Sequence, residues 1–161
     1  YLNPVFKYGY DRFFARCASA GISGIIVPDM PLEEKGEVAD IAAKHGVDVI
    51  SLIAPTSKER IAKIAKSATG YIYIVSSMGV TGMRSEITTD LESIVRVVKE
   101  NTSVPAAIGF GINTPEQAKK YAGIADGVIV GSAIVKIIEK YGKNAAEPVY
   151  NYVKEMADAV K

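Results

Sequence analysis

The sequence is poor in the residues on which disulfides, metal sites and membrane spans depend. Its 161 residues include one cysteine, one histidine and no tryptophan. A single cysteine excludes an internal disulfide and suits a reducing cytoplasm, and a single histidine argues against a His-rich metal site. The apolar runs are far shorter than the about 20 residues of a membrane-spanning helix. A net charge of +1 predicts no basic surface for nucleic acid.

Five short runs rich in Val and Ile predict buried parallel strands, because they are apolar on both faces. They are Gly24–Pro28, Val47–Ala54, Tyr71–Ser76, Pro105–Phe110 and Gly127–Gly131. Amphipathic spacing predicts helices at Asp11–Ala20, Ser57–Ala68, Leu91–Lys99, from Thr114 onward, Ala133–Tyr141 and Ala146–Val160. Thr56 with Glu59, and Thr114 with Gln117, predict capping boxes at two of these helix starts. This alternation predicts one α/β domain over residues 1–161, either an open doubly wound sheet or a (β/α)₈ barrel.

Functional residues of either architecture collect just after the carboxyl ends of the strands. Glycines end the last two strands, at 109–111 and at Gly131-Ser132, and each is followed by a helix start. Glycines admit a ligand close to the backbone and a helix N-terminus favours an anion, so the pair predicts a phosphate site. Tyr73 is expected to face the interior, and the loop from 77 to 90 has the length of a lid.

Acid–base groups are scarce at these strand ends. Asp29 is the carboxylate that follows a strand there, and it is either an acid–base group or a turn residue bonded to nearby backbone. No lysine lies on or directly after a predicted strand, which disfavours a Schiff-base aldolase. His45 is expected to be a solvated turn residue and Cys17 an inert core residue. The sequence therefore predicts a phosphate site without an acid–base pair.

Seven motifs occur in the order and spacing found in the tryptophan synthase α chain, which this sequence resembles over essentially its whole length. They are YLNP at 1–4, IVPDMP at 26–31, APTS at 54–57, YIY at 71–73, GVTG at 79–82, GFGI at 109–112 and GSAIV at 131–135. The resemblance implies a (β/α)₈ TIM barrel and a lyase that cleaves indole-3-glycerol phosphate to indole and glyceraldehyde 3-phosphate in tryptophan biosynthesis. It implies no metal or cofactor in this subunit, and an α₂β₂ complex in which indole passes to a pyridoxal-phosphate-dependent β subunit.

The resemblance also assigns roles to individual residues. The substrate phosphate would be held by Phe110, Gly111, Gly131 and Ser132, and the rest of the pocket would be lined by Tyr1, Tyr73 and Ile129. A closing lid would contain Gly79, Thr81 and Gly82, and the β subunit would meet Asn3, Asp29 and Pro31. Neither nucleic acid nor a membrane is implied as a partner.

The family's catalytic glutamate and aspartate belong to a region expected upstream of Tyr1, so no catalytic residue is assigned in this chain. Tyr1–Asn3 would be the end of the third barrel strand, and the five predicted strands would be the fourth to the eighth. These residues alone are expected to lack lyase activity and to need the missing strands or a second copy for solubility. Two alternatives remain open, namely another phosphate-binding barrel of amino-acid biosynthesis and a non-catalytic half-barrel that binds a partner.

Overall fold

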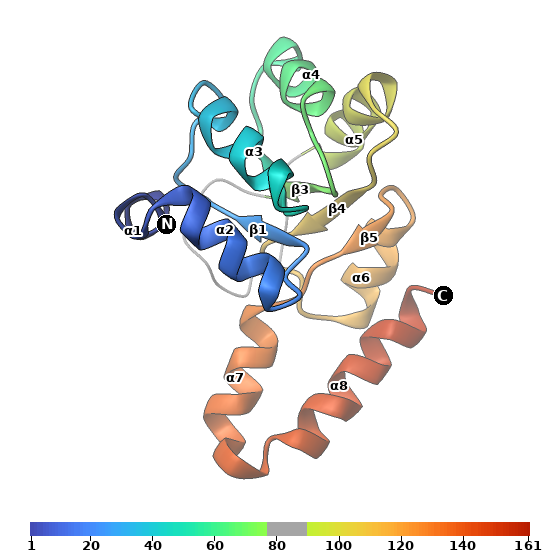
Figure 1. The fold of residues 1–161 in the computed structure, drawn as a ribbon. Helices are drawn as coiled ribbons and strands as arrows, with labels where there is room; N and C mark the ends of the chain where they lie inside the picture. Colours follow the sequence, from blue (N-terminus) through green and yellow to red (C-terminus); the bar gives the residue numbers. More distant parts are fainter. Residues whose placement is uncertain (77–89) are drawn as a thin grey trace.

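The structure, a computed structural model, describes residues 1–76 and 90–161 as one parallel sheet with helices packed on its outer face (Figure 1). The helices are α1 (Leu2–Tyr8), α2 (Tyr10–Ser19), α3 (Lys35–Lys44), α4 (Lys58–Lys66), α5 (Leu91–Asn101), α6 (Pro115–Ala122), α7 (Ser132–Tyr141) and α8 (Ala146–Ala159), with a 3₁₀ turn at Gly142–Asn144. The strands are β1 (Gly24–Ile26), β2 (Asp48–Ile53), β3 (Ile72–Val75), β4 (Ala106–Gly109) and β5 (Gly127–Val128).

The sheet order decides between the two predicted architectures. The strands lie side by side in chain order, β1-β2-β3-β4-β5, and every neighbouring pair is parallel. A doubly wound sheet reverses its order at a switch point, whereas a barrel adds each strand beside the previous one. Helices α3 to α6 fan around the same side of the sheet (Figure 1). The described residues therefore form five consecutive strands of a (β/α)₈ barrel.

Side-chain alternation along the strands separates a helix-covered face from an inner face. On β3, Ile72 and Ile74 are fully buried in a core that also contains side chains of α4 and α5. Tyr73 and Val75 point to the opposite face and are half-buried. The β3 strand therefore presents a tyrosine toward the interior of the barrel, as the sequence predicts.

The chain start differs from the sequence prediction. Leu2 and Asn3 begin helix α1 and are not the end of a strand, so that expectation is wrong. The Leu2 N–H donates to Asp29 Oδ1 at 2.9 Å, which satisfies a donor that the first helical turn leaves without a partner. Pro4 fits the first turn because its missing N–H would have no helical acceptor there.

The sequence prediction also differs from the structure at α3 and at the start of α4. Helix α3 falls outside the predicted helices. The capping box expected at Thr56 and Glu59 is wrong by one residue, because Ser57 is the N-cap of α4 and its Oγ accepts the Arg60 N–H. By contrast, the box at Thr114 and Gln117 is confirmed at the start of α6.

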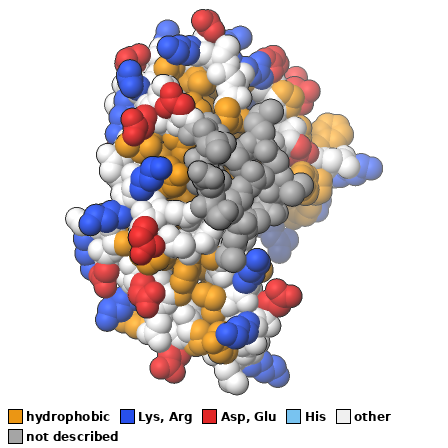
Figure 2. Space-filling model, turned by 180° about the vertical axis from the view of Figure 1, so that it is seen from behind, with side chains coloured by type: hydrophobic (Ala, Val, Ile, Leu, Met, Phe, Trp, Pro, Cys, Tyr) orange, Lys and Arg blue, Asp and Glu red, His pale blue; other side chains and the backbone are white. Residues whose placement is uncertain are grey.

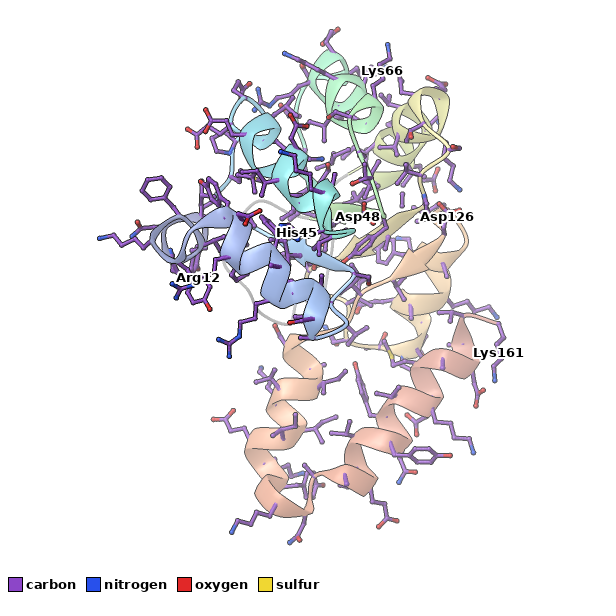
Figure 3. The ribbon with its side chains drawn as sticks, in the orientation of Figure 1. Arg12, His45, Asp48, Lys66, Asp126 and Lys161 are labelled. Carbon is purple, nitrogen blue, oxygen red and sulfur yellow. The ribbon has the colours of Figure 1, made fainter. Side chains whose placement is uncertain are left out.

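The lone histidine and the lone cysteine both lie where α2 meets α3. His45 ends α3, and its Nε2 lies 2.9 Å from Asp11 Oδ1 on α2, so it is more than a solvated turn residue (Figure 3). Cys17 is buried in the core between α2 and α3, as predicted. Within the described residues, no helix is long and apolar enough to cross a membrane.

Candidate active site

The ends of β4 and β5 bring the two glycine motifs together. Ile108 pairs with Val128, and the Ile129 N–H extends the ladder by donating to the Ile108 carbonyl at 2.8 Å. Half-buried Ile129 therefore lies beside the β4 end. Because the strands are parallel, the segment after Gly109 and the segment after Ile129 leave the same edge of the sheet. The predicted neighbours Phe110, Gly111, Gly131 and Ser132 stand on these two segments.

The backbone turns sharply after β4. Phe110 has φ +71°, the one positive φ of a non-glycine residue in the described parts of the chain, and Gly111 follows at φ +84°. The buried Ser76 hydroxyl donates to the Phe110 carbonyl, which ties this turn to the end of β3. A positive φ is costly at Phe110, whereas Gly111 adopts it readily, so the conformation of Phe110 is held by its surroundings.

Tyr73 packs directly into this turn. Its ring meets the Phe110 ring edge-on, with the centroids 5.9 Å apart. Burial raises the pKa of Tyr73, nearby Tyr71 raises it further, and a backbone hydrogen bond with Phe110 acts in the opposite direction. The tyrosine is therefore a neutral phenol at the inner face, beside the residues predicted to hold phosphate.

Helix α7 starts with unsatisfied backbone donors. Its N-cap is Gly131, and no side chain in the described part of the chain caps it. A Cβ placed on Gly131 would meet no atom of the described residues within 4 Å, so none of them crowds this position. In α6, by contrast, Thr114 and Gln117 cap the helix reciprocally. Of these two helix starts at the β4–β5 edge, that of α7 is the one suited to an anion.

A cavity of about 560 Å³ opens beside the ends of β1, β2 and β3 and reaches Phe110. Its walls are mainly apolar, and none of the described lining residues is Asp or Glu. They are Val27, Pro28, Met30, Pro31, Leu32, Lys35, Ile50, Ser51, Leu52, Ala54, Pro55, Thr56, Arg60, Ile64, Val75 and Phe110. The cavity suits an apolar group but supplies no carboxylate for proton transfer.

Lys35 is the site feature that the sequence prediction missed. It is 8% exposed, and its Nζ donates to Ser51 Oγ at 2.6 Å and to the Ser67 carbonyl at 3.1 Å. Burial lowers its pKa, which Asp48 partly offsets. The spacing of residues in the sequence could have indicated its burial. Lys35, Val38 and Ala42 recur at helical intervals and together form the buried stripe of α3.

The residues expected at the partner surface lie near the start of α1. Asn3 is exposed there. Tyr1, which the resemblance assigns to the substrate pocket, is 80% exposed beside it and is not among the residues that line the cavity. Asp29 accepts the Leu2 N–H, so it acts as a loop residue that joins α1 to the segment after β1. Pro31 is exposed on that segment. The expected lid residues Gly79, Thr81 and Gly82 lie outside the described residues.

Comparison with known sequences decides the family. A family model described as tryptophan synthase alpha chain matches residues 1–161. The chain belongs to the tryptophan synthase alpha chain family. A relative from Lacticaseibacillus casei is 54% identical over 160 residues, and one from Caldanaerobacter subterraneus is 52% identical over 147 residues. Both bear the family's name, so the alternative of a different phosphate-binding barrel is not favoured.

Solved structures agree with this assignment. The tryptophan synthase α subunit from Pyrococcus furiosus superposes on 98% of the chain with a TM-score of 0.85 and 34% identity. The α chain from Legionella pneumophila superposes on 99% of it with a TM-score of 0.83 and 38% identity. The chain covers 64% and 60% of these two structures, and 60% of the L. casei relative. It therefore spans about three fifths of the length of its family members.

Proposed function

We propose that this chain is the phosphate-binding and indole-binding part of a lyase that cleaves indole-3-glycerol phosphate. Family membership and the joined ends of β4 and β5 carry the proposal. The first-turn N–H groups of α7 at Gly131 and Ser132, with the turn at Phe110 and Gly111, would hold the phosphate. The apolar cavity would receive the indole. Tyr1, Tyr73 and Ile129 do not line that cavity in the described structure, and they would complete the pocket around the substrate, with Tyr73 already packed on Phe110 at the cavity's edge.

The reaction is a retro-aldol-like cleavage of a carbon–carbon bond. It needs an acid that protonates the indole ring carbon and a base that takes the proton of the substrate hydroxyl. Two carboxylates can divide this work when their surroundings separate their pKa values. The cavity has no carboxylate among its described lining residues, so both groups would come from the family segment that this chain does not match. Binding of the remote phosphate would position the substrate for them.

The proposed assembly is an α₂β₂ complex in the cytoplasm. Asn3, Asp29 and Pro31 form an exposed surface at α1 and the segment after β1, where the β subunit would dock. The β subunit would carry the pyridoxal phosphate, and this subunit would need no cofactor. Gly79, Thr81 and Gly82 would belong to the lid that excludes water during the reaction.

The test compares two chains, this one and the same residues extended upstream by the unmatched segment of the L. casei relative. We expect indole release from indole-3-glycerol phosphate by the extended chain only. Indole release by the 161-residue chain alone would refute the placement of both carboxylates outside it. An extended, folded chain that binds no substrate would refute the function itself.

A pair of matched variants tests the phosphate site in the extended chain. Ser132→Asp places a negative charge at the start of α7 and is expected to lower kcat/KM by roughly tenfold or more, because the carboxylate repels the phosphate. Ser57→Asp places the same charge at the start of α4, away from the β4–β5 edge, and is expected to leave kcat/KM unchanged.

A further inference from the structure

Lys35 lies in the wall of the cavity beside the ends of β1, β2 and β3, although it belongs to a helix. It is the first residue of α3, and it lines the cavity together with Ser51 of β2. No lysine lies on or directly after a predicted strand, but a helix brings this one to the cavity. A lysine in a cavity is a candidate nucleophile for carbonyl compounds when its amine is neutral.

The hydrogen bonds of Lys35 Nζ suit a neutral amine. Nζ donates to Ser51 Oγ at 2.6 Å and to the Ser67 carbonyl at 3.1 Å. A neutral amine has two N–H groups and one lone pair, whereas an ammonium ion has three N–H groups. The two described acceptors therefore accommodate both donors of the neutral form. Lys35 also takes part in none of the ion pairs between described residues.

Burial favours the same neutral form. Lys35 and Ser51 are both buried, and an ammonium ion is costly in such surroundings when no carboxylate pairs with it. Burial therefore lowers the pKa of Lys35, and the charge of Asp48 offsets only part of this effect. Lysines that act as nucleophiles are activated in this way, because the neutral amine carries the lone pair that attacks a carbonyl carbon.

The cavity indicates which carbonyl compounds would suit this amine. Its volume of about 560 Å³ and its mainly apolar walls suit a compound with an apolar body, such as an aromatic ring. Figure 2 shows the molecule from behind, and apolar side chains reach the surface in its upper half, the height at which α3 and α4 lie in Figure 1. The favoured class is therefore an aldehyde or ketone with an apolar body.

We propose that Lys35 binds an aldehyde or ketone covalently as an imine, with the apolar part of that compound in the cavity. The lone pair of Nζ attacks the carbonyl carbon, and the electrons of the C=O π bond move to the oxygen. The two hydrogens of the amine then leave with this oxygen as water while the C=N double bond forms. Ser51 Oγ, 2.6 Å from Nζ, is placed to pass a proton from the nitrogen to the leaving oxygen.

Reductive trapping tests the proposal on the 161-residue chain and on the extended chain. Each is incubated with benzaldehyde and cyanoborohydride, which reduces an imine to a stable secondary amine, and peptide mass spectrometry measures the modification of every lysine. In the folded chain at about pH 7, Lys35 is expected to react roughly tenfold or more faster than Lys44. Lys44 is the matched control, because it is exposed near the end of the same helix. In urea the two lysines should react alike.

Acetaldehyde tests the part that the cavity plays. It has no aromatic ring to occupy the apolar walls, so the preference for Lys35 over Lys44 should be several times smaller than with benzaldehyde. The proposal would be overturned if Lys35 reacted no faster than Lys44 in both chains. A preference for Lys35 that persisted in urea, or that was the same with both aldehydes, would overturn it as well.

Free indole separates this proposal from the proposed function, on which it does not rest. Indole bound in the cavity should protect Lys35, and not Lys44, from benzaldehyde. Fast modification of Lys35 without protection by indole would support the imine site and count against the cavity as the indole pocket. Indole release from indole-3-glycerol phosphate by an extended chain whose Lys35 reacts no faster than Lys44 would support the lyase and refute the imine site.

Discussion

Gly109 and the Tyr73 ring leave no room for a side chain between them. A Cβ on Gly109 would lie 2.3 Å from Tyr73 Oη and 2.5 Å from its Cζ. Gly109→Ala is therefore expected to lower the free energy of unfolding by about 1–3 kcal/mol, because the packed ring must shift. Gly36→Ala in α3 is the control, since its Cβ meets nothing within 4 Å. It should be neutral or raise stability by up to about 1 kcal/mol. Urea unfolding measures both, and equal stability of the two variants would contradict this account.

Lys35 gives the folded chain a distinct response to alkaline pH. Burial lowers its pKa below the ordinary 10.5, so between the folded and unfolded pKa values the unfolded chain binds more protons. The contribution of Lys35 to the unfolding free energy therefore rises with pH through that window. We expect the stability difference between the wild type and Lys35→Met to shift in favour of the wild type from neutral pH to about pH 10. Tyrosine ionisation is common to both proteins and cancels in the difference. A difference that does not change with pH would show that Lys35 titrates alike in both states.

Helix α4 offers a test of the residue that begins it. Ser57 Oγ accepts the Arg60 N–H at 3.3 Å, whereas Thr56, the cap expected from the sequence, is exposed at the mouth of the cavity. Ser57→Ala is expected to cost about 1 kcal/mol of unfolding free energy through the lost cap. Thr56→Ala should change it by less than about 0.5 kcal/mol. The reverse ranking in urea unfolding would restore the sequence-based assignment.

At the scale of helices and strands, the sequence predicts those features that depend on residues close together in the chain. All five strands are found where apolar runs predict them, and the box at Thr114 and Gln117 is confirmed because all its groups lie within four residues. Features that depend on distant contacts were missed. Helix α1 starts where Asp29, 27 residues away, accepts its first N–H, and Lys35 is buried against Ser67, 32 residues away. Likewise, the glycines after β4 and β5 suggested a phosphate site, but their adjacency follows from strand pairing alone.

For the whole molecule, periodicity could not choose between an open sheet and a barrel, because both alternate strands with helices. The order of the strands in the sheet identifies the barrel. The same order leaves the outer edges of β1 and β5 without a partner among the described residues. In the proposed function, the family segment that this chain does not match would supply further strands as well as the acid and the base. Completion of the sheet and completion of the active site are therefore one event in the proposed enzyme.

The open edges make self-association the expected behaviour of the 161-residue chain alone. Unpaired N–H and C=O groups on an edge strand are a template for another strand, and a net charge of +1 provides little repulsion between copies. Gel filtration with light scattering should show a mass that rises with concentration, and extension by the upstream segment should yield a monomer. Ile26→Lys is expected to reduce the association, because Ile26 is 42% exposed on β1 and a lysine there blocks edge pairing. Ala43→Lys adds the same charge on α3 and should leave the association unchanged unless charge alone causes the effect. A compact monomer of the unmodified chain at all concentrations would contradict this prediction, because the edges of β1 and β5 would then not act as templates for another strand.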